Sequence, residues 1–168
     1  KNLSRHSASK PTPEADMDPT GCIETESFQG ACQCGAVRYT VAPGPARQTI
    51  CHCRMCQRAT GNAFAPLMEV ENARIQWQGY AKTYRSSNIA ERGFCDECGT
   101  PLFYRRLGAD STEFMVGTID TEIDYRPIAH HGIESRRGWV LELAGLTERE
   151  TFFTEGEQMI SHQYEHGT

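Results

Sequence analysis

The chain has 168 residues, a formal net charge of −5 and 38% hydrophobic residues, which is enough for one domain with its own core. Its mean hydropathy is −0.56, and it lacks the apolar run of about 20 residues that a membrane span needs. The acidic balance argues against nucleic acid as the main partner, because binding to a phosphate backbone needs a basic face. With no apolar leader near the start of the sequence, we expect a cytoplasmic protein that does not bind membranes.

Residues 1–27 are polar and carry two prolines close together, so they predict a flexible N-terminal tail. Cys22 lies in this tail, apart from the other cysteines. We interpret it as a spare, partly exposed thiol rather than a redox or dimer-forming cysteine.

The domain is predicted over residues 28–150. Apolar and polar residues alternate over 37–41, which predicts a strand. Because residues two apart in a strand face the same side, Cys32 and Cys34 can point at one metal ion. The segment from Met55 to Thr60 predicts a helical turn that ends at Gly61.

Further short strands are expected along the rest of the domain, over residues 63–70, 74–78, 83–87, 102–104, 113–119 and 139–143. Pro66 suits an edge or a bulge of its strand. Thr147 and Glu150 match a capping box and predict a short helix, followed by a partly helical extension over 151–168. Many short strands separated by turn signals predict a mainly β fold.

Seven of the eight cysteines fall into three clusters of local spacing: Cys32 and Cys34, then Cys51, Cys53 and Cys56, then Cys95 and Cys98. Such short spacings make poor disulfide loops and good metal-ligand sets. The third cluster is a C-x-x-C-G segment, in which the glycine lets backbone N–H groups approach the thiolates. The cysteines therefore predict zinc binding.

The spacing leaves two groupings open. In the first, the C-x-C pair joins Cys95 and Cys98 in a closed four-thiolate site and leaves an open three-thiolate site. In the second, Cys53 and Cys56 join Cys95 and Cys98 as a zinc ribbon. Spacing favours the first modestly, since it leaves no cluster broken. An open site would allow chemistry, because zinc with a vacant position lowers the pKa of a bound thiol or polarises a carbonyl.

The cysteines stand in recognisable surroundings: Gly30-Ala31-Cys32-Gln33-Cys34-Gly35-Ala36-Val37-Arg38-Tyr39, Cys51-His52-Cys53-Arg54-Met55-Cys56, Gly61, Arg85-Ser86-Ser87, Phe94-Cys95-Asp96-Glu97-Cys98-Gly99-Thr100-Pro101-Leu102, and the late segment from His131 through Ser135 to Trp139-Val140. This pattern, over about residues 28–146, resembles the glutathione-dependent formaldehyde-activating enzyme family, whose domain is shared with centromere protein V.

The resemblance implies a β-rich, tent-like arrangement of short antiparallel sheets, similar to the Mss4-like fold. It also implies two Zn²⁺ ions per chain, one structural and one catalytic. The structural ion would be held by Cys32, Cys34, Cys95 and Cys98, and the catalytic ion by Cys51, Cys53 and Cys56. The activity implied is that of a carbon–sulfur lyase, which condenses formaldehyde with glutathione to S-hydroxymethylglutathione.

Several other residues are candidates for the site. His52 lies between two proposed ligands, where it could act as a base, although such a histidine more often packs elsewhere. Arg92 could hold a substrate carboxylate, with Ser86 and Ser87 nearby in the sequence and His131 from the late motif. Each of these also has an ordinary structural or surface role as its alternative.

We therefore predict a zinc enzyme that acts on a small thiol adduct, most simply a glutathione conjugate. Two alternatives stay open: a non-enzymatic zinc-binding interaction module, and the same fold acting on a different small electrophile. The sequence is compatible with a homo-oligomer but does not specify one.

Overall fold

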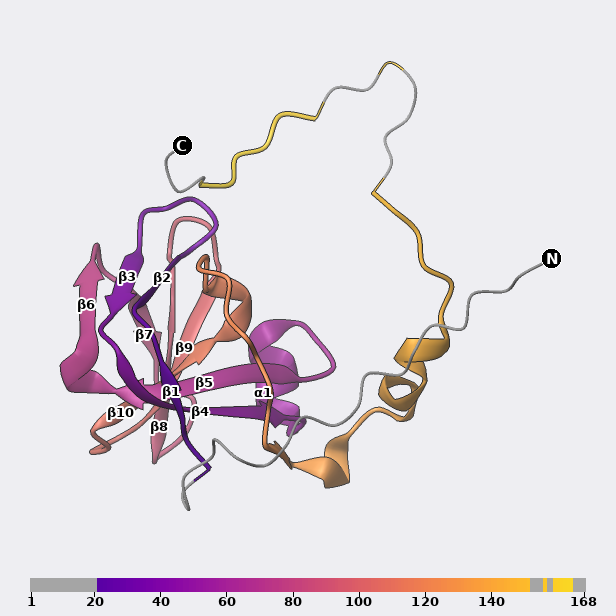
Figure 1. Ribbon diagram of the computed structural model, residues 1–168, viewed down its shortest axis with the longest axis horizontal. Coiled ribbons are helices and arrows are strands. Elements are labelled where there is room, and N and C mark those ends of the chain that lie inside the picture. Colours follow the sequence, from indigo (N-terminus) through magenta and orange to yellow (C-terminus); the bar gives the residue numbers. More distant parts are fainter. Residues whose placement is uncertain (1–20, 152–155, 157–158, 165–168) are drawn as a thin grey trace.

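The computed structural model describes residues 21–151, 156 and 159–164. Within them the chain forms two sheets, one α-helix and several short 3-10 helices (Figure 1). The strands are β1 (Ile23–Thr25), β2 (Phe28–Ala31), β3 (Arg38–Val41), β4 (Gly44–Cys51), β5 (Ala65–Glu71), β6 (Ile75–Gln78), β7 (Lys82–Tyr84), β8 (Ala90–Phe94), β9 (Pro101–Arg106), β10 (Ser111–Met115) and β11 (Ala129–His131). The helices are α1 (Arg54–Thr60), η2 (Asn72–Arg74), η3 (Val116–Thr118), η4 (Ile133–Ser135) and η5 (Gly138–Gly145). The predicted mainly β fold is confirmed.

The larger sheet has the strand order β1-β4-β5-β10-β9-β8-β7 and is antiparallel along this path. β11 pairs with β4 in parallel, which sets His131 beside Cys51. The smaller sheet is antiparallel, in the order β2-β3-β6. β1 falls inside the segment expected to be a tail, yet it pairs with β4 at the end of the larger sheet.

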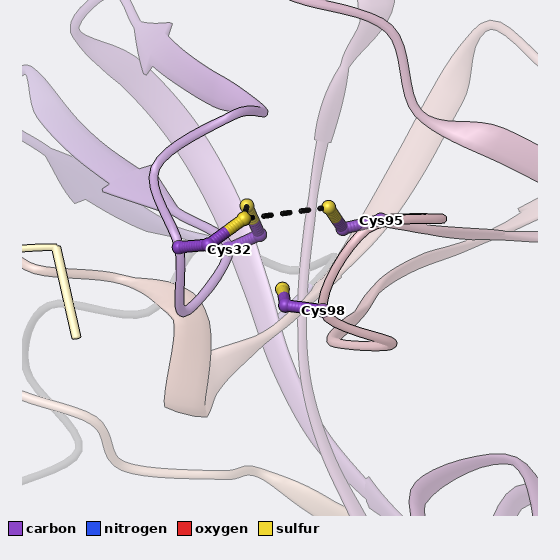
Figure 2. Close-up of side chains that lie close together, drawn as sticks. Cys32, Cys95 and Cys98 are labelled. Carbon is purple, nitrogen blue, oxygen red and sulfur yellow. Dashed lines mark hydrogen bonds between the residues drawn. The ribbon is translucent and has the colours of Figure 1, made fainter. Parts of the chain in front are cut away.

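Two cysteine-bearing loops, one from each sheet, face each other. Cys32 and Cys34 lie between β2 and β3 of the smaller sheet, while Cys95 and Cys98 lie between β8 and β9 of the larger one. Figure 2 shows the side chains of Cys32, Cys95 and Cys98 turned toward one another across the gap between the loops. The cluster therefore links segments of the chain that are about sixty residues apart, since Cys34 and Cys95 differ by 61 positions.

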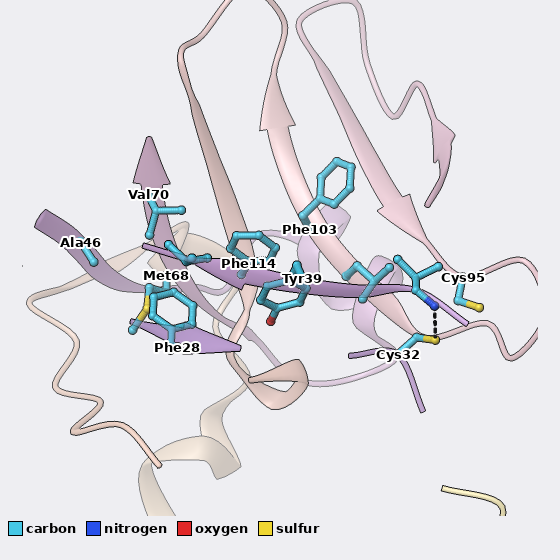
Figure 3. Packing of buried hydrophobic residues seen from close by; sticks show 12 residues of the cluster. Phe28, Cys32, Tyr39, Ala46, Met68, Val70, Cys95, Phe103 and Phe114 are labelled. Atoms are coloured by element: carbon cyan, nitrogen blue, oxygen red, sulfur yellow. Dashed lines mark hydrogen bonds between the residues drawn. The ribbon is translucent and has the colours of Figure 1, made fainter. Parts of the chain in front are cut away.

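The main core lies between the sheets (Figure 3). Tyr39 from β3 stacks on Phe114 from β10, with ring centroids 4.0 Å apart, and its hydroxyl is 2.9 Å from Thr118 Oγ1. Other members of the core are Phe28, Val37, Val41, Met68, Val70, Leu102 and Phe103. Burial of each such large apolar side chain stabilises the folded state by about 1.5–3 kcal/mol. Cys32 and Cys95 belong to the same cluster of buried residues, so the core sets the position of the cysteine loops.

Two elements expected near the C-terminus are wrong. Residues 139–143 are not a strand but part of η5, which lies apart from both sheets in Figure 1. The alternation of Trp139, Leu141 and Leu143 does not match a half-buried sheet face, because all three side chains are exposed. No helix follows Thr147 among the described residues 147–151. A capping box satisfies a helix end, but it does not supply the apolar face that stabilises a short helix.

Other elements were placed correctly but with different bounds. The strand expected over 113–119 ends at Met115 and continues as η3, and the one expected over 83–87 is the shorter β7. Pro66 is not on an edge strand, since β5 lies between β4 and β10. It pairs with Ile50 of β4, whereas β10 pairs with β5 only from Leu67 onward. The missing N–H of Pro66 therefore falls where β10 has already ended.

No helix in the described part of the chain is long and apolar enough to cross a membrane.

Candidate metal centres and active site

The first cluster consists of Cys32, Cys34, Cys95 and Cys98, whose sulfur atoms all lie within 4.8 Å of one another. The Cys34 sulfur is 3.6 Å from that of Cys32 and 3.8 Å from that of Cys95. A zinc–sulfur bond of about 2.3 Å gives a tetrahedron with sulfur–sulfur edges of about 3.8 Å. The four donors therefore fit a closed tetrahedral zinc site.

Backbone turns shape both loops of this cluster. Gly35 donates its N–H to the carbonyl of Cys32 at 3.0 Å, and Gly99 donates to that of Cys95 at 2.9 Å. Both glycines have a φ near +76°, a conformation that L side chains adopt at a cost. Val37 N–H also donates to Cys32 Sγ at 3.3 Å. Such N–H donors stabilise a thiolate, which is the form that binds zinc.

The second cluster consists of Cys51, Cys53 and Cys56, also with sulfur atoms within 4.8 Å of one another. Cys51 ends β4, Cys53 caps α1, and Cys56 lies in the first turn. Cys53 Sγ accepts a hydrogen bond from the N–H of Cys56 at 3.4 Å, as a capping side chain does. Gly61 ends the helix with φ 64°, as the sequence predicted. Among the described residues, no fourth Cys, His, Asp or Glu joins this group, so the donor set fits zinc with one position left for another ligand.

The structure separates the seven cysteines into sets of four and three. Cys53 and Cys56 are therefore not grouped with Cys95 and Cys98, as the zinc-ribbon alternative required. Cys22 lies outside both sets, in a pocket with Arg47 and Glu69.

Arg92 of β8 provides positive charge at the three-cysteine cluster. Its Nη2 donates to Cys56 Sγ at 3.3 Å, and its guanidinium lies over the ring of Tyr104, 5.0 Å from the centroid. Arg92 is only 8% exposed, and its Nη1 has no hydrogen-bond partner. A hydrogen bond from Cys51 lowers the pKa of Cys56 to about 5, against burial and with help from Arg92. The same hydrogen bond raises the pKa of Cys51.

A pocket of about 200 Å³ opens on this cluster. Its lining residues are Cys51, Cys53, Met55, Cys56, Leu67, Arg92, Tyr104, Glu113 and His131. Strand register places three of them in one row, because Tyr104 of β9 is paired with Arg92 on one side and with Glu113 on the other. Directly paired residues face the same side of a sheet, so these side chains meet over the cysteines.

Glu113 is the acid of this pocket. Among the described residues, its carboxyl group has no hydrogen bond and no ion pair. Burial raises the pKa of Glu113 to about 7, and the neighbouring Glu69 carboxylate adds to the rise. Glu113 can therefore carry or release a proton near neutral pH, beside the cysteine cluster.

The structure divides the other predicted site residues. Arg92 and His131 line the pocket. Ser86 and Ser87 lie in the turn before β8, where Ser86 Oγ donates to the Ala90 carbonyl and Ser87 Oγ accepts from Ile89 N–H. His52 is 1% exposed and does not line the pocket; its Nε2 is 3.0 Å from His130 Nδ1.

Sequence reasoning missed Glu113 and Tyr104. Glu113 sits in a segment that was correctly expected to be a strand, and the signal available was a lone acid next to a run of apolar residues. Gly132 lies in the late segment that starts at His131, and no packing role was predicted for it. A Cβ built on Gly132 would lie 2.6 Å from Cys53 N, so the late segment packs directly on the start of α1.

Comparison with known proteins finds a matching family. The family model described as glutathione-dependent formaldehyde-activating enzyme matches residues 27–135. The chain belongs to this family. The match includes all seven clustered cysteines, Arg92, Glu113 and His131. Family membership does not by itself fix a substrate.

Two curated proteins are similar to this chain at low sequence identity. An uncharacterized lyase of Schizosaccharomyces pombe is 27% identical over 52% of this chain and 64% of its own length, so the chain spans less than two thirds of that relative. A Halomonas elongata protein, named as a candidate glutathione-dependent formaldehyde-activating enzyme, is 24% identical over 67% of this chain and 79% of its own length. A crystal structure of a Rhodobacter sphaeroides protein is 21% identical, with a TM-score of 0.48 over 61% of this chain and 99% of that chain.

Proposed function

We propose that the protein is a zinc-dependent carbon–sulfur lyase that condenses a thiol with a small aldehyde, with glutathione and formaldehyde as its substrates. The observation that carries the proposal is a three-cysteine cluster with no fourth protein ligand among the described residues, opening on a pocket that also holds Arg92 and Glu113. The name of the Halomonas relative supports the choice of substrates.

Two zinc ions fit the donor sets. Cys32, Cys34, Cys95 and Cys98 would hold one that links the two sheets and contributes to folding. Cys51, Cys53 and Cys56 would hold the second at the pocket. Zinc at such an open site supplies Lewis acidity, which lowers the pKa of a thiol or polarises a carbonyl oxygen.

Arg92 favours the thiolate form of Cys56. Three thiolates close together repel one another, and the guanidinium hydrogen-bonded to Cys56 Sγ offsets part of that charge. Because Arg92 is buried, its charge is poorly screened by water. Arg92 therefore stabilises the thiolate form of a zinc ligand. The Tyr104 ring lies against the guanidinium and holds it in place.

Glu113 supplies the proton that the aldehyde oxygen takes up during the condensation. As the sulfur of the thiolate bonds to the aldehyde carbon, the carbonyl π bond opens and its oxygen gains the electron pair. The Glu113 carboxyl group gives its proton to that oxygen, which becomes the hydroxyl of the adduct. The carboxylate then takes a proton from the next thiol, so the cycle conserves protons. A pKa of about 7 suits both directions of transfer.

A larger electrophile is a second candidate substrate, for one specific reason. Arg92 also lines a neighbouring apolar pocket of about 320 Å³ with Tyr84, Phe94, Phe103 and Met115. Formaldehyde has no group to fill it. An aldehyde with an apolar substituent would, and it would be distinguished by a higher kcat/KM than formaldehyde.

The test measures formation of S-hydroxymethylglutathione above the uncatalysed rate, for the wild type and for Cys53→Ser. Cys22→Ser is the matched control, since Cys22 lies outside both clusters. We expect Cys53→Ser to lose turnover while staying folded, and Cys22→Ser to keep it. A folded and fully active Cys53→Ser variant would overturn the proposal. Bound zinc without turnover on any aldehyde would favour a binding module instead.

A further inference from the structure

A second, larger groove lies on another face of α1. It measures about 490 Å³ and is lined by Arg54, Gln57, Arg58, Gly61, Asn62, Ala63, Arg137 and Trp139. Arg54, Gln57, Arg58 and Gly61 follow the spacing of one helix face, whereas Cys53, Cys56 and Thr60 follow that of a neighbouring face. The groove and the cysteine cluster therefore share one short helix.

The groove is strongly basic in an acidic protein. Three arginines line it and no carboxylate does, although the chain as a whole has a net charge of −5. None of the three forms an ion pair with any residue that the structure describes. Guanidinium groups gathered without counter-charges attract an anion.

A buried amide arranges two of these arginines. Gln57 is 4% exposed, and its Nε2 donates to the carbonyls of His52 at 2.6 Å and Ser135 at 2.8 Å. Its Oε1 accepts from Arg54 and from Arg137, the latter at 3.2 Å. The amide therefore holds both guanidinium groups on one side of the groove and leaves most of their N–H groups free for a ligand.

The remaining two lining residues complement this pair. Arg58 makes no hydrogen bond within the described residues and can turn toward a ligand. Trp139, 54% exposed, offers a flat apolar face at the side of the groove. Together they fit a ligand with more than one carboxylate and a planar peptide group between them.

The groove and the cysteine cluster are also built from neighbouring segments of the chain. Arg54 directly follows Cys53, and Arg137 belongs to the segment in which Gly132 packs on Cys53. A tripeptide extends about 10 Å, comparable with the diameter of a helix with its side chains. The pocket at the cysteines is too small for a whole tripeptide, since drug-sized ligands occupy sites of about 300–1,000 Å³.

We propose that this arginine groove binds the carboxylates of a small peptide thiol of the glutathione class, while its sulfur reaches the cysteine pocket. This inference rests on the proposed function for the role of the thiol. Binding in the groove, however, does not require turnover, so the two can fail separately.

The test uses S-methylglutathione, which keeps both carboxylates but has no free thiol, and measures its affinity by calorimetry with the zinc-loaded protein. We expect Arg58→Gln to weaken binding by about tenfold or more, as loss of a charge-assisted contact does. Arg149→Gln is the control, because Arg149 is exposed and lies outside the groove. The diethyl ester of S-methylglutathione, which lacks both carboxylates, should bind as weakly to the wild type as to Arg58→Gln.

Three possible results distinguish a failure of the groove proposal from a failure of the proposed reaction. Arginine-dependent binding of S-methylglutathione without turnover would keep the groove and discard the proposed reaction. Turnover with a glutathione KM that Arg58→Gln leaves unchanged would overturn the groove. Inorganic phosphate bound as tightly as S-methylglutathione, with equal loss in Arg58→Gln, would also overturn it, because the groove would then be a general anion site.

Discussion

Arg92 Nη2 donates a hydrogen bond to Cys56 Sγ over 3.3 Å, which joins β8 to α1 across 36 positions of the chain. The contact is buried, and Tyr104 covers the other side of the guanidinium. A buried charge next to a thiolate is worth more than the same pair at the surface, because water screens it less. We therefore expect the affinity of the three-cysteine cluster for zinc to depend on a residue that is not itself a proposed ligand.

Arg92→Gln should release the zinc of the three-cysteine cluster more readily. Residues that hydrogen-bond to metal ligands typically change metal affinity by about 10- to 100-fold. Zinc release can be followed with a chromogenic chelator, and the four-cysteine site serves as an internal reference. Arg92→Lys, which keeps the charge but loses the fork, should fall between the variant and the wild type. Equal release from all three proteins would show that Arg92 has no such role.

The two cysteine clusters should differ in what their loss does to the fold. Cys98→Ser removes a ligand from the site that links both sheets, so we expect an unfolded or insoluble chain. Cys53→Ser removes a ligand from a site held by one helix and one strand end, so the fold should persist with the structural zinc in place. Circular dichroism and elemental zinc analysis measure both. A soluble, folded Cys98→Ser variant without zinc would contradict the structural assignment.

Gly132→Ala should disturb the start of α1. Gly132 has a φ of 64°, and an added Cβ would meet the backbone of Cys53 at 2.6 Å. Positive φ in a residue with a side chain and backbone overlap together cost about 1–3 kcal/mol. Thermal unfolding should show this loss, together with weaker zinc binding at the neighbouring cysteine cluster. Gly138→Ala is the matched control, because a Cβ there meets nothing within 4 Å.

How much of this site the sequence could predict depends on the range of each contact. Cys53, Cys56 and Gly61 act within one helix, and the loops at Cys32 and Cys95 each act within one turn, so local spacing predicted these features. The joining of the two loops into one four-cysteine set spans 61 positions of the chain, and spacing alone left it open. Glu113 and Tyr104 reach the site through strand register, which places residues from β8, β9 and β10 in one row. Local sequence does not specify such a pairing, because register depends on the whole sheet.

The same reasoning explains the error at residues 139–143. Alternating apolar residues predict a strand only where a neighbouring strand and a core exist to receive them. There, Trp139 turns out to border the arginine groove instead of a sheet. The C-terminal contact at Tyr164, whose hydroxyl accepts a hydrogen bond from Arg38 at 2.9 Å, had no local signal at all.

Glu113→Gln should change how stability depends on pH. Burial, then Glu69, raise the pKa of the Glu113 carboxyl from its usual value of 4.5 to about 7 in the folded protein. A raised carboxyl pKa means that the folded state holds the proton more tightly than the unfolded chain does. The stabilisation is therefore complete below pH 4.5 and is lost as the pH rises through 7. At about 1.36 kcal/mol per pKa unit, the loss approaches about 3 kcal/mol.

Glutamine stays neutral, so the free energy of unfolding of Glu113→Gln should lack this fall between pH 4.5 and 8. Denaturant unfolding at several pH values measures it, with the difference from wild type taken at matched zinc content so that cysteine titration cancels. Glu142→Gln, at an exposed carboxylate, should leave the profile of the wild type unchanged. If Glu113→Gln also follows the wild-type profile, then Glu113 is charged throughout this range, and it cannot be the proton donor of the pocket.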